Sequence, residues 1–322
     1  VSERSWITTD LMMENRTCNP ASFSDSIVWV SSIQCICAFI ALVGNSLVII
    51  SVWKFARLRT VTNYFVVSLA AADLLVALNV PFYDSFYFLS DMACHRSLCL
   101  LRYLFANYAS SCSAFSLVGV AVDRYVSIVH GMSYYRLMRY RLAVGYIVSM
   151  WLFLLFFALL PCMGFGANAN YPFEFKVVVC DLAYVYSPEF ILILGGVFWT
   201  CTLVTLSLYF FVFRAAWKQL KAIAAAGDVH HRVRQEARTA CTMALVLTVC
   251  ILGYVPYFVI VSLPFMMQDS TTIALDVKPY VICLYFGKSA LNPVIYGWKA
   301  KDFRAAFREV IFSKKLNDAS HS

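Results

Sequence analysis

The chain has 322 residues, of which 61% are hydrophobic and only 14% are charged, with a mean hydropathy of +0.71 and a formal net charge of +8. Soluble domains carry about 25% charged residues, so this composition excludes an ordinary soluble protein and indicates a chain that is solvated by a bilayer. The sequence has no His-Glu-x-x-His motif, no Gly-x-Ser-x-Gly motif and no phosphate-binding glycine loop. We therefore expect no enzymatic activity, no metal and no cofactor.

Seven mainly apolar segments follow one another along the chain, separated by short polar or basic joints. A membrane-spanning helix needs about 20 mostly apolar residues. The pattern predicts an all-α membrane protein, a seven-transmembrane helix bundle that occupies residues 26–298 behind an extracellular segment, 1–25. The predicted spans are 26–53, 61–88, 96–129, 141–164, 187–220, 234–266 and 277–298.

The stretch after the seventh span reads as a different kind of helix. Phe303, Phe307 and Ile311 recur at helical spacing among Lys and Arg residues. The segment is too short and too charged to span, so it should lie along the membrane surface. We expect residues 299–322 to form this short amphipathic cytoplasmic helix and a short tail.

Basic residues set the expected orientation. Most of the 26 Lys and Arg residues fall in the joints after the first, third, fifth and seventh spans. Basic loops stay in the cytoplasm, so the N-terminus should be extracellular in a multi-pass plasma-membrane protein. The sequon at Asn15 would then be available for glycosylation. The charge is explained by topology and by attraction to membrane lipid, so no nucleic-acid partner is expected.

Four short motifs place polar residues inside the spans, where a charge or an amide is costly and usually functional. They are Gly44-Asn45, Asp73 after Leu69-Ala70-Ala71-Ala72, Asp123-Arg124-Tyr125, and Asn292-Pro293-Val294-Ile295-Tyr296. In this order they resemble the rhodopsin-like (class A) G-protein-coupled receptors. The segments Val61–Asp73 and Arg214–Lys221, and Trp151 with Pro161, are similar to adenosine receptors.

The resemblance implies a receptor that binds an extracellular ligand and activates heterotrimeric G proteins. It also implies a disulfide between Cys99 and Cys180 that holds a loop over the ligand pocket. Cys18 and Cys94 either form a second bridge or remain free. A transporter or channel is the main rival from another class, but we find no repeated halves and no broken helices in the sequence.

The resemblance also implies a switch at the cytoplasmic face. Arg124 would be held by Asp123 and by Glu236 at the start of the sixth span, and outward movement of that span would release it. Tyr209 and Tyr296 would stabilise the open form. The alternative is that Arg124 only reaches the headgroups and that Glu236 is a solvated surface acid. The remaining members of the predicted switch are Tyr125, Asn292 and Pro293.

A second buried group departs from the family. Asp73, Ser113 and Asn292 resemble its sodium site, but Lys288 lies one helical turn before Asn292, where the family usually has a neutral residue. We expect an internal Asp73–Lys288 pair that replaces sodium, because each charge offsets the desolvation of the other. The alternative is that Lys288 points elsewhere or is neutral.

The predicted ligand pocket also departs from its relatives. Ala106 stands where amine receptors place an aspartate, and Leu182, Ala183, Val261 and Phe286 stand where adenosine receptors hold the purine. Phe286 also replaces the lysine that binds retinal in visual pigments. A neutral, fairly apolar small molecule fits best, and an adenosine or other purine receptor with an altered pocket is the alternative. The remaining predicted contacts are Asn107, Ser110, Ser111, Tyr254 and Tyr285, with Asp181 and Lys278 at the mouth.

Overall fold

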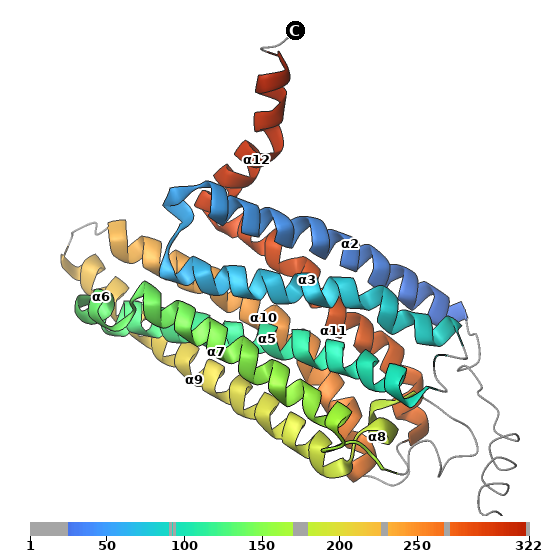
Figure 1. Ribbon diagram of the computed structural model, residues 1–322. Helices are drawn as coiled ribbons and strands as arrows, with labels where there is room; N and C mark the ends of the chain where they lie inside the picture. The colour runs from blue at the N-terminus through green and yellow to red at the C-terminus, as the bar shows by residue number, and fades with distance from the viewer. Residues whose placement is uncertain are drawn as a thin grey trace, which may run out of the picture.

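The computed structural model describes residues 25–89, 92, 95–169, 180–226, 231–266 and 271–319. Within these ranges the chain is almost entirely helical, and seven long helices run lengthwise through a single bundle (Figure 1). Their bounds differ from the predicted spans by a few residues at the ends. The long helices are α2 (Asp25–Lys54), α3 (Val61–Phe88), α5 (Arg96–Val129), α7 (Tyr140–Leu159), α9 (Pro188–Ala226), α10 (His231–Met266) and α11 (Thr271–Lys299).

Short elements connect these helices in the described residues. At one end of the bundle the joints hold a 3-10 turn at Ala56–Leu58, a second at Gly131–Ser133, and α6 (Tyr134–Leu137). At the other end of the bundle, α7 continues into a 3-10 turn at Leu160–Met163, and α8 (Leu182–Val185) follows Cys180.

Six of the helices are long and apolar enough to cross a membrane. The seventh, α11, matches them in length but carries Lys288 and Asn292, which are 2% and 0% exposed in the bundle interior. Large apolar side chains such as Trp29, Phe39 and Trp53 are more than two-thirds exposed on the outer surface. Polar groups inside and apolar groups outside are the distribution that a bilayer requires.

Gly44 lets α2 and α11 approach each other closely. A Cβ atom at this position would lie only 2.5 Å from Cγ of Pro293. One residue on, the Asn45 amide donates to the carbonyl oxygens of Ala41 and Ser289, at 2.9 and 3.1 Å. Because helix association in membranes depends on small residues and interhelical hydrogen bonds, this pair fixes how α11 sits against α2.

The helix after the seventh span, α12 (Lys301–Ala319), runs across the bundle axis and away from the bundle (Figure 1). Its first turns are anchored by Phe303, which is buried and stacks on Tyr296 with ring centroids 5.6 Å apart. Arg57 and Glu309 form a half-exposed ion pair of 2.5 Å between α12 and the first joint. The helix ends at Ala319, within the predicted segment 299–322.

Candidate functional site

The carboxylate of Asp73 on α3 is the centre of a fully buried polar cluster. Its Oδ1 accepts a hydrogen bond from Ser289 Oγ at 2.7 Å, and its Oδ2 accepts one from Asn292 Nδ2 at 2.6 Å. Ser113 Oγ donates to Oδ1 at 3.4 Å. The structure thus brings the predicted residues together and adds Ser289, which sequence reasoning missed although it lies between Lys288 and Asn292.

The ammonium of Lys288 joins this cluster. Its Nζ lies 4.0 Å from Asp73 Oδ1, 3.5 Å from Ser113 Oγ, and 4.2 Å from the centroid of the Tyr254 ring. The side chain fits because α10 has a glycine opposite it, and a Cβ on Gly253 would lie 3.1 Å from Lys288 carbons. Lys288 therefore points into the bundle and links Asp73 to the aromatic floor of the pocket.

These residues do not fit a sodium ion. Sodium is a hard cation that needs several oxygen ligands around the carboxylate. Here the Asp73 carboxylate already accepts hydrogen bonds from Ser113, Ser289 and Asn292. The Lys288 ammonium also lies beside Oδ1 of this carboxylate. Two cations that share one buried carboxylate would repel each other at low dielectric.

Arg124, near the C-terminal end of α5, is held in a buried network. Its guanidinium donates twice to Asp123 Oδ2, at 3.0 Å from Nε and 2.5 Å from Nη2, and it also contacts Thr62 Oγ1. Thr62 donates to Asp123 Oδ2 at 2.6 Å, and Tyr134 on α6 donates to Oδ1 at 2.8 Å. Sequence reasoning missed Thr62 and Tyr134 because neither belongs to a motif.

Tyr134 stays a donor to this network. Burial and the negative charge of Asp123 raise the pKa of the Tyr134 hydroxyl well above its usual value. The hydroxyl is therefore protonated throughout the physiological range and donates to Oδ1 of Asp123, whereas Thr62 donates to Oδ2.

Among the described side chains, no other predicted switch residue forms a hydrogen bond with Arg124 except Asp123. The Glu236 side chain is outside the described residues, so its expected pairing with Arg124 stays a prediction. Tyr209 and Tyr296 are buried, and within the described part of the chain their hydroxyls have no hydrogen-bond partner. Tyr125 turns away from the network and packs edge-on against His130 and Phe211.

A pocket opens in the other half of the bundle, between α5, α7, α9, α10 and α11. It encloses about 770 Å³ of empty space, including open solvent at its mouth. Seven of the predicted residues line it, namely Asn107, Ser110, Ser111, Leu182, Tyr254, Val261 and Tyr285. Residues of α7 and α9 that sequence reasoning missed also line it, including Leu154, Phe157, Leu194, Gly195, Phe198 and Cys201.

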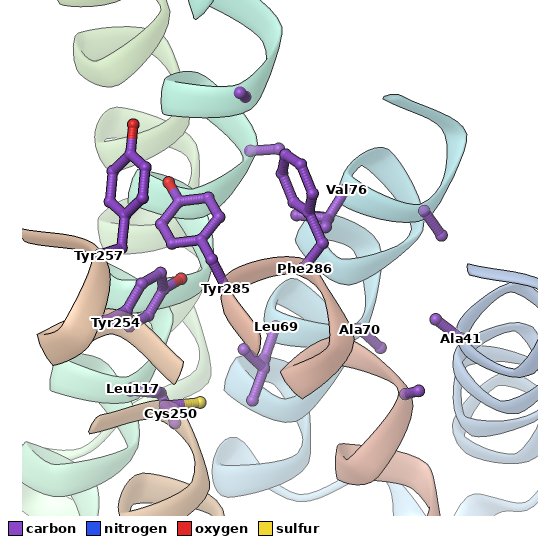
Figure 2. Close-up of a cluster of buried hydrophobic side chains, with 14 of the residues drawn as sticks. Ala41, Leu69, Ala70, Val76, Leu117, Cys250, Tyr254, Tyr257, Tyr285 and Phe286 are labelled. Atoms are coloured by element: carbon purple, nitrogen blue, oxygen red, sulfur yellow. The ribbon is translucent and has the colours of Figure 1, made fainter. Parts of the chain in front are cut away.

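Ala106 and Phe286, also predicted as pocket residues, are not part of this lining. The Phe286 ring packs edge-on against Tyr83 of α3 at 4.9 Å, and Figure 2 shows it beside Val76, on the far side of Tyr285 from the other tyrosines. Ala106 is buried in the hydrophobic core. On α11 it is Tyr285, rather than the adjacent Phe286, that lines the pocket.

Three tyrosines, Tyr254, Tyr257 and Tyr285, line the pocket, and Figure 2 shows them close to one another. The Tyr257 and Tyr285 rings are 4.4 Å apart, and Tyr254 lies 5.4 Å from Tyr285. The Tyr254 hydroxyl donates to the carbonyl of Ser110 at 2.8 Å. Tyr254 is thus fixed between the pocket and Lys288.

A disulfide joins Cys99 of α5 to Cys180, as the resemblance implied. The Cys180 carbonyl also accepts hydrogen bonds from Arg102 at 3.1 Å and Tyr103 at 3.2 Å. Lys278 forms an ion pair with Asp181, the residue after Cys180. These contacts hold α8 against the pocket mouth. Asn15, Cys18, Cys94 and the Ala183 side chain lie outside the described residues.

Comparison with known proteins agrees with this architecture. The family model described as "7 transmembrane receptor (rhodopsin family)" matches residues 44–296. The chain belongs to this family. It is therefore a G-protein-coupled receptor of the plasma membrane rather than an enzyme, and the transporter or channel alternative is not supported.

Individual relatives of this rhodopsin-family receptor differ in their ligands. The human adenosine receptor A2a is 32% identical over 297 residues, which cover 87% of this chain and 71% of that receptor. The Drosophila melanogaster octopamine receptor beta-1R is 30% identical, with 85% of this chain and 59% of that receptor covered. The rat somatostatin receptor type 1 is 24% identical, with 92% and 74% covered. Similarity to these receptors therefore does not decide which ligand this receptor binds.

Proposed function

We propose that this receptor binds a neutral, mainly apolar small molecule in the pocket between α5, α7, α9, α10 and α11. One observation carries the proposal: among the described residues, no charged side chain lines the pocket. A few neutral polar groups, such as Asn107 and Ser110, stand among aromatic and aliphatic side chains. Such a lining orients a ligand through few hydrogen bonds and derives most of its affinity from apolar contact.

The lining argues against the alternative of an adenosine or purine receptor. Val261 and Leu182 line the pocket and are apolar, so they offer no hydrogen bond or stacking surface to a purine. Phe286 lies outside the lining and has no hydrogen-bonding group. A binding site loses much of its affinity for a ligand when the residues that hydrogen-bond to that ligand are replaced by apolar ones. An amine would likewise lose its usual carboxylate partner, because Ala106 stands at that position.

Signalling would proceed through outward movement of α10 at its cytoplasmic end. The Asp123 carboxylate and Thr62 hold Arg124 in this structure, and release of Arg124 would make its guanidinium available to the G protein. The unpaired hydroxyls of Tyr209 and Tyr296 supply groups that could hold an open arrangement. Such a bistable element is what an agonist needs in order to shift the population of states.

We also propose how the chain is oriented in the membrane. Residues 1–25 would be extracellular, 26–298 would form the bundle, and 299–322 would lie at the cytoplasmic membrane surface. The support is the concentration of Lys and Arg in the joints next to α12 and around α6.

The test is cyclic AMP and calcium signalling in cells that express the receptor at a measured surface density. The additions are adenosine, biogenic amines, a panel of neutral lipophilic compounds, and buffer alone. We expect a response to a neutral compound and none to adenosine, and Arg124→Ala should abolish it. A response to adenosine or an amine that requires Tyr254 and Asn107 would contradict the proposed ligand class.

A further inference from the structure

The pocket does not stop at the bundle interior. From the tyrosines it continues outward past Phe115 of α5 and Phe157 of α7 to Leu194 and Val197 of α9. Phe115 and Phe157 are only partly buried, and Val197 is 39% exposed on the outer surface of the bundle. In a spanning bundle this outer surface faces lipid tails, so the pocket and the bilayer share a boundary between α7 and α9.

Gly195 stands at this boundary without a side chain. A Cβ atom built on Gly195 would meet no other group within 4 Å, so the space beside it is open. Gly195 lines the pocket, whereas its neighbour Gly196 does not. Gly196 has the same open space around it but is exposed. The two adjacent glycines thus differ in burial and in that only the first borders the pocket.

In the bilayer, Gly195 would lie at the depth of the lipid acyl chains. At 1.5 Å of rise per residue, Gly195 lies about 10 Å along α9 from its first residue, Pro188. With the proposed orientation, Pro188 is at the extracellular end, so the opening would face the outer leaflet. At the water side, Leu182 of α8 is 4% exposed and lines the pocket, and Tyr186 is 1% exposed. This described part of the loop covers the mouth.

The inner end of the pocket offers the hydroxyl of Ser110, which lies near Tyr285. Ser110 Oγ is buried and has no hydrogen-bond partner among the described residues. A buried polar atom without a partner is unfavourable, and a ligand's hydroxyl or carbonyl would supply the missing hydrogen bond. Asn107 is nearby with only a 3.5 Å contact to Tyr186. The far end, toward Gly195, is lined by carbon.

We infer that the ligand is a membrane-partitioned molecule with one polar end, which enters from the outer leaflet between α7 and α9, past Gly195, and hydrogen-bonds to Ser110. The inference rests on the proposed function and narrows it, from any neutral small molecule to a lipid-like one. The polar end travels inward first, and the apolar remainder lies against Leu154, Phe157 and Leu194.

The test uses the full-length receptor in lipid nanodiscs with a long-chain alcohol that carries a photoactivatable diazirine near its hydroxyl. Irradiation followed by peptide mass spectrometry should place label on the α5 segment around Ser110. Gly195→Trp would fill the opening, because an indole there projects into open space rather than into packed atoms. If displacing the indole costs about 1.4 kcal/mol, labelling at early times falls about tenfold. Gly196→Trp is the matched control and should label like the wild type.

A second variant tests whether reduced labelling results from misfolding. Gly195→Leu is smaller and should reduce the labelling rate by an intermediate amount, with surface expression and the Cys99–Cys180 bond intact. Labelling at Ser110 that is as fast in Gly195→Trp as in Gly196→Trp would overturn the inference. So would labelling confined to the outer surface of α9 in the wild type.

The two proposals fail differently. If the wild-type receptor responds to a water-soluble neutral agonist and Gly195→Trp leaves the response rate unchanged, the proposed function stands and the membrane route is wrong. If the alcohol reaches Ser110 through Gly195 but no neutral compound alters signalling, the route stands and the proposed function fails.

Discussion

Lys288 Nζ lies 4.0 Å from Asp73 Oδ1 and 4.2 Å from the centroid of the Tyr254 ring. One ammonium therefore contacts both the buried acid of the bundle and the aromatic floor of the pocket. A ligand that moves Tyr254 would change the environment of the ion pair directly. Lys288 thus couples the ligand pocket, through Tyr254, to the buried cluster around Asp73.

Sodium should have little effect on this receptor. Replacing NaCl by choline chloride at equal ionic strength should leave basal and agonist-stimulated guanine-nucleotide exchange unchanged, because the Lys288 ammonium already serves Asp73. Lys288→Asn removes that cation and should make exchange sensitive to sodium. A strong sodium effect on the wild type would contradict the internal ion pair. Lys278→Asn, which changes a lysine at the pocket mouth, is the control.

Removing one member of the buried pair should destabilise the receptor more than removing both. Asp73→Asn keeps the shape of the side chain but leaves the Lys288 ammonium without its counter-ion, which costs about 3–5 kcal/mol for a buried charge. The double variant Asp73→Asn with Lys288→Met should recover much of that loss. Thermal unfolding of the wild type, the two single variants and the double variant, all in the same detergent and lipid, completes the double-mutant cycle. Additive losses would indicate that the two groups do not interact.

Weakening the contacts of Arg124 should raise signalling in the absence of ligand. Asp123→Asn removes the charge that accepts both guanidinium hydrogen bonds, and Glu236→Ala removes the predicted partner on α10. Both variants should raise basal nucleotide exchange at equal surface expression. Glu309→Ala removes an acid from a half-exposed ion pair and should change nothing, because such pairs contribute about 0–1 kcal/mol. Unchanged basal exchange in Asp123→Asn would show that this network does not restrain the receptor.

A methyl group on Gly44 should destabilise the bundle. The new Cβ of Gly44→Ala would lie 2.5 Å from Pro293 Cγ, so α2 and α11 would have to separate. Overpacking of this kind costs about 1–3 kcal/mol. Gly145→Ala on α7 is the matched control, because its Cβ meets nothing within 4 Å and a helical alanine should be neutral or stabilising. Equal melting temperatures for the two variants would contradict the close approach of α2 and α11.

The sequence was sufficient for the helices and for the polar residues of the bundle. Apolar length predicts each span, and the cost of a buried charge explains why Asp73, Lys288 and Asn292 lie together inside. Rotation of a helix about its axis is harder to predict. Phe286 and Tyr285 are adjacent, and only packing against Tyr83 decides which of them faces the pocket.

The outer part of the pocket was also beyond sequence reasoning. Phe157, Leu194 and Gly195 are ordinary apolar residues of spans, and no pattern separates a pocket wall from a lipid-facing surface. Thr62, Tyr134 and Ser289 carry no motif of their own, so their part in the buried networks follows only from the three-dimensional arrangement. Motifs identified the charged centres, whereas the groups that satisfy those charges came from the structure.

Guanine-nucleotide exchange on a purified heterotrimeric G protein, with the receptor in nanodiscs, tests the central claim most directly. The wild type and Arg124→Ala would be compared with buffer, with adenosine, and with neutral lipophilic compounds. We expect a neutral compound to accelerate nucleotide exchange by the wild type. Adenosine should not accelerate it, and no compound should accelerate exchange by Arg124→Ala. Exchange driven by adenosine or a charged amine, or a full response from Arg124→Ala, would contradict it.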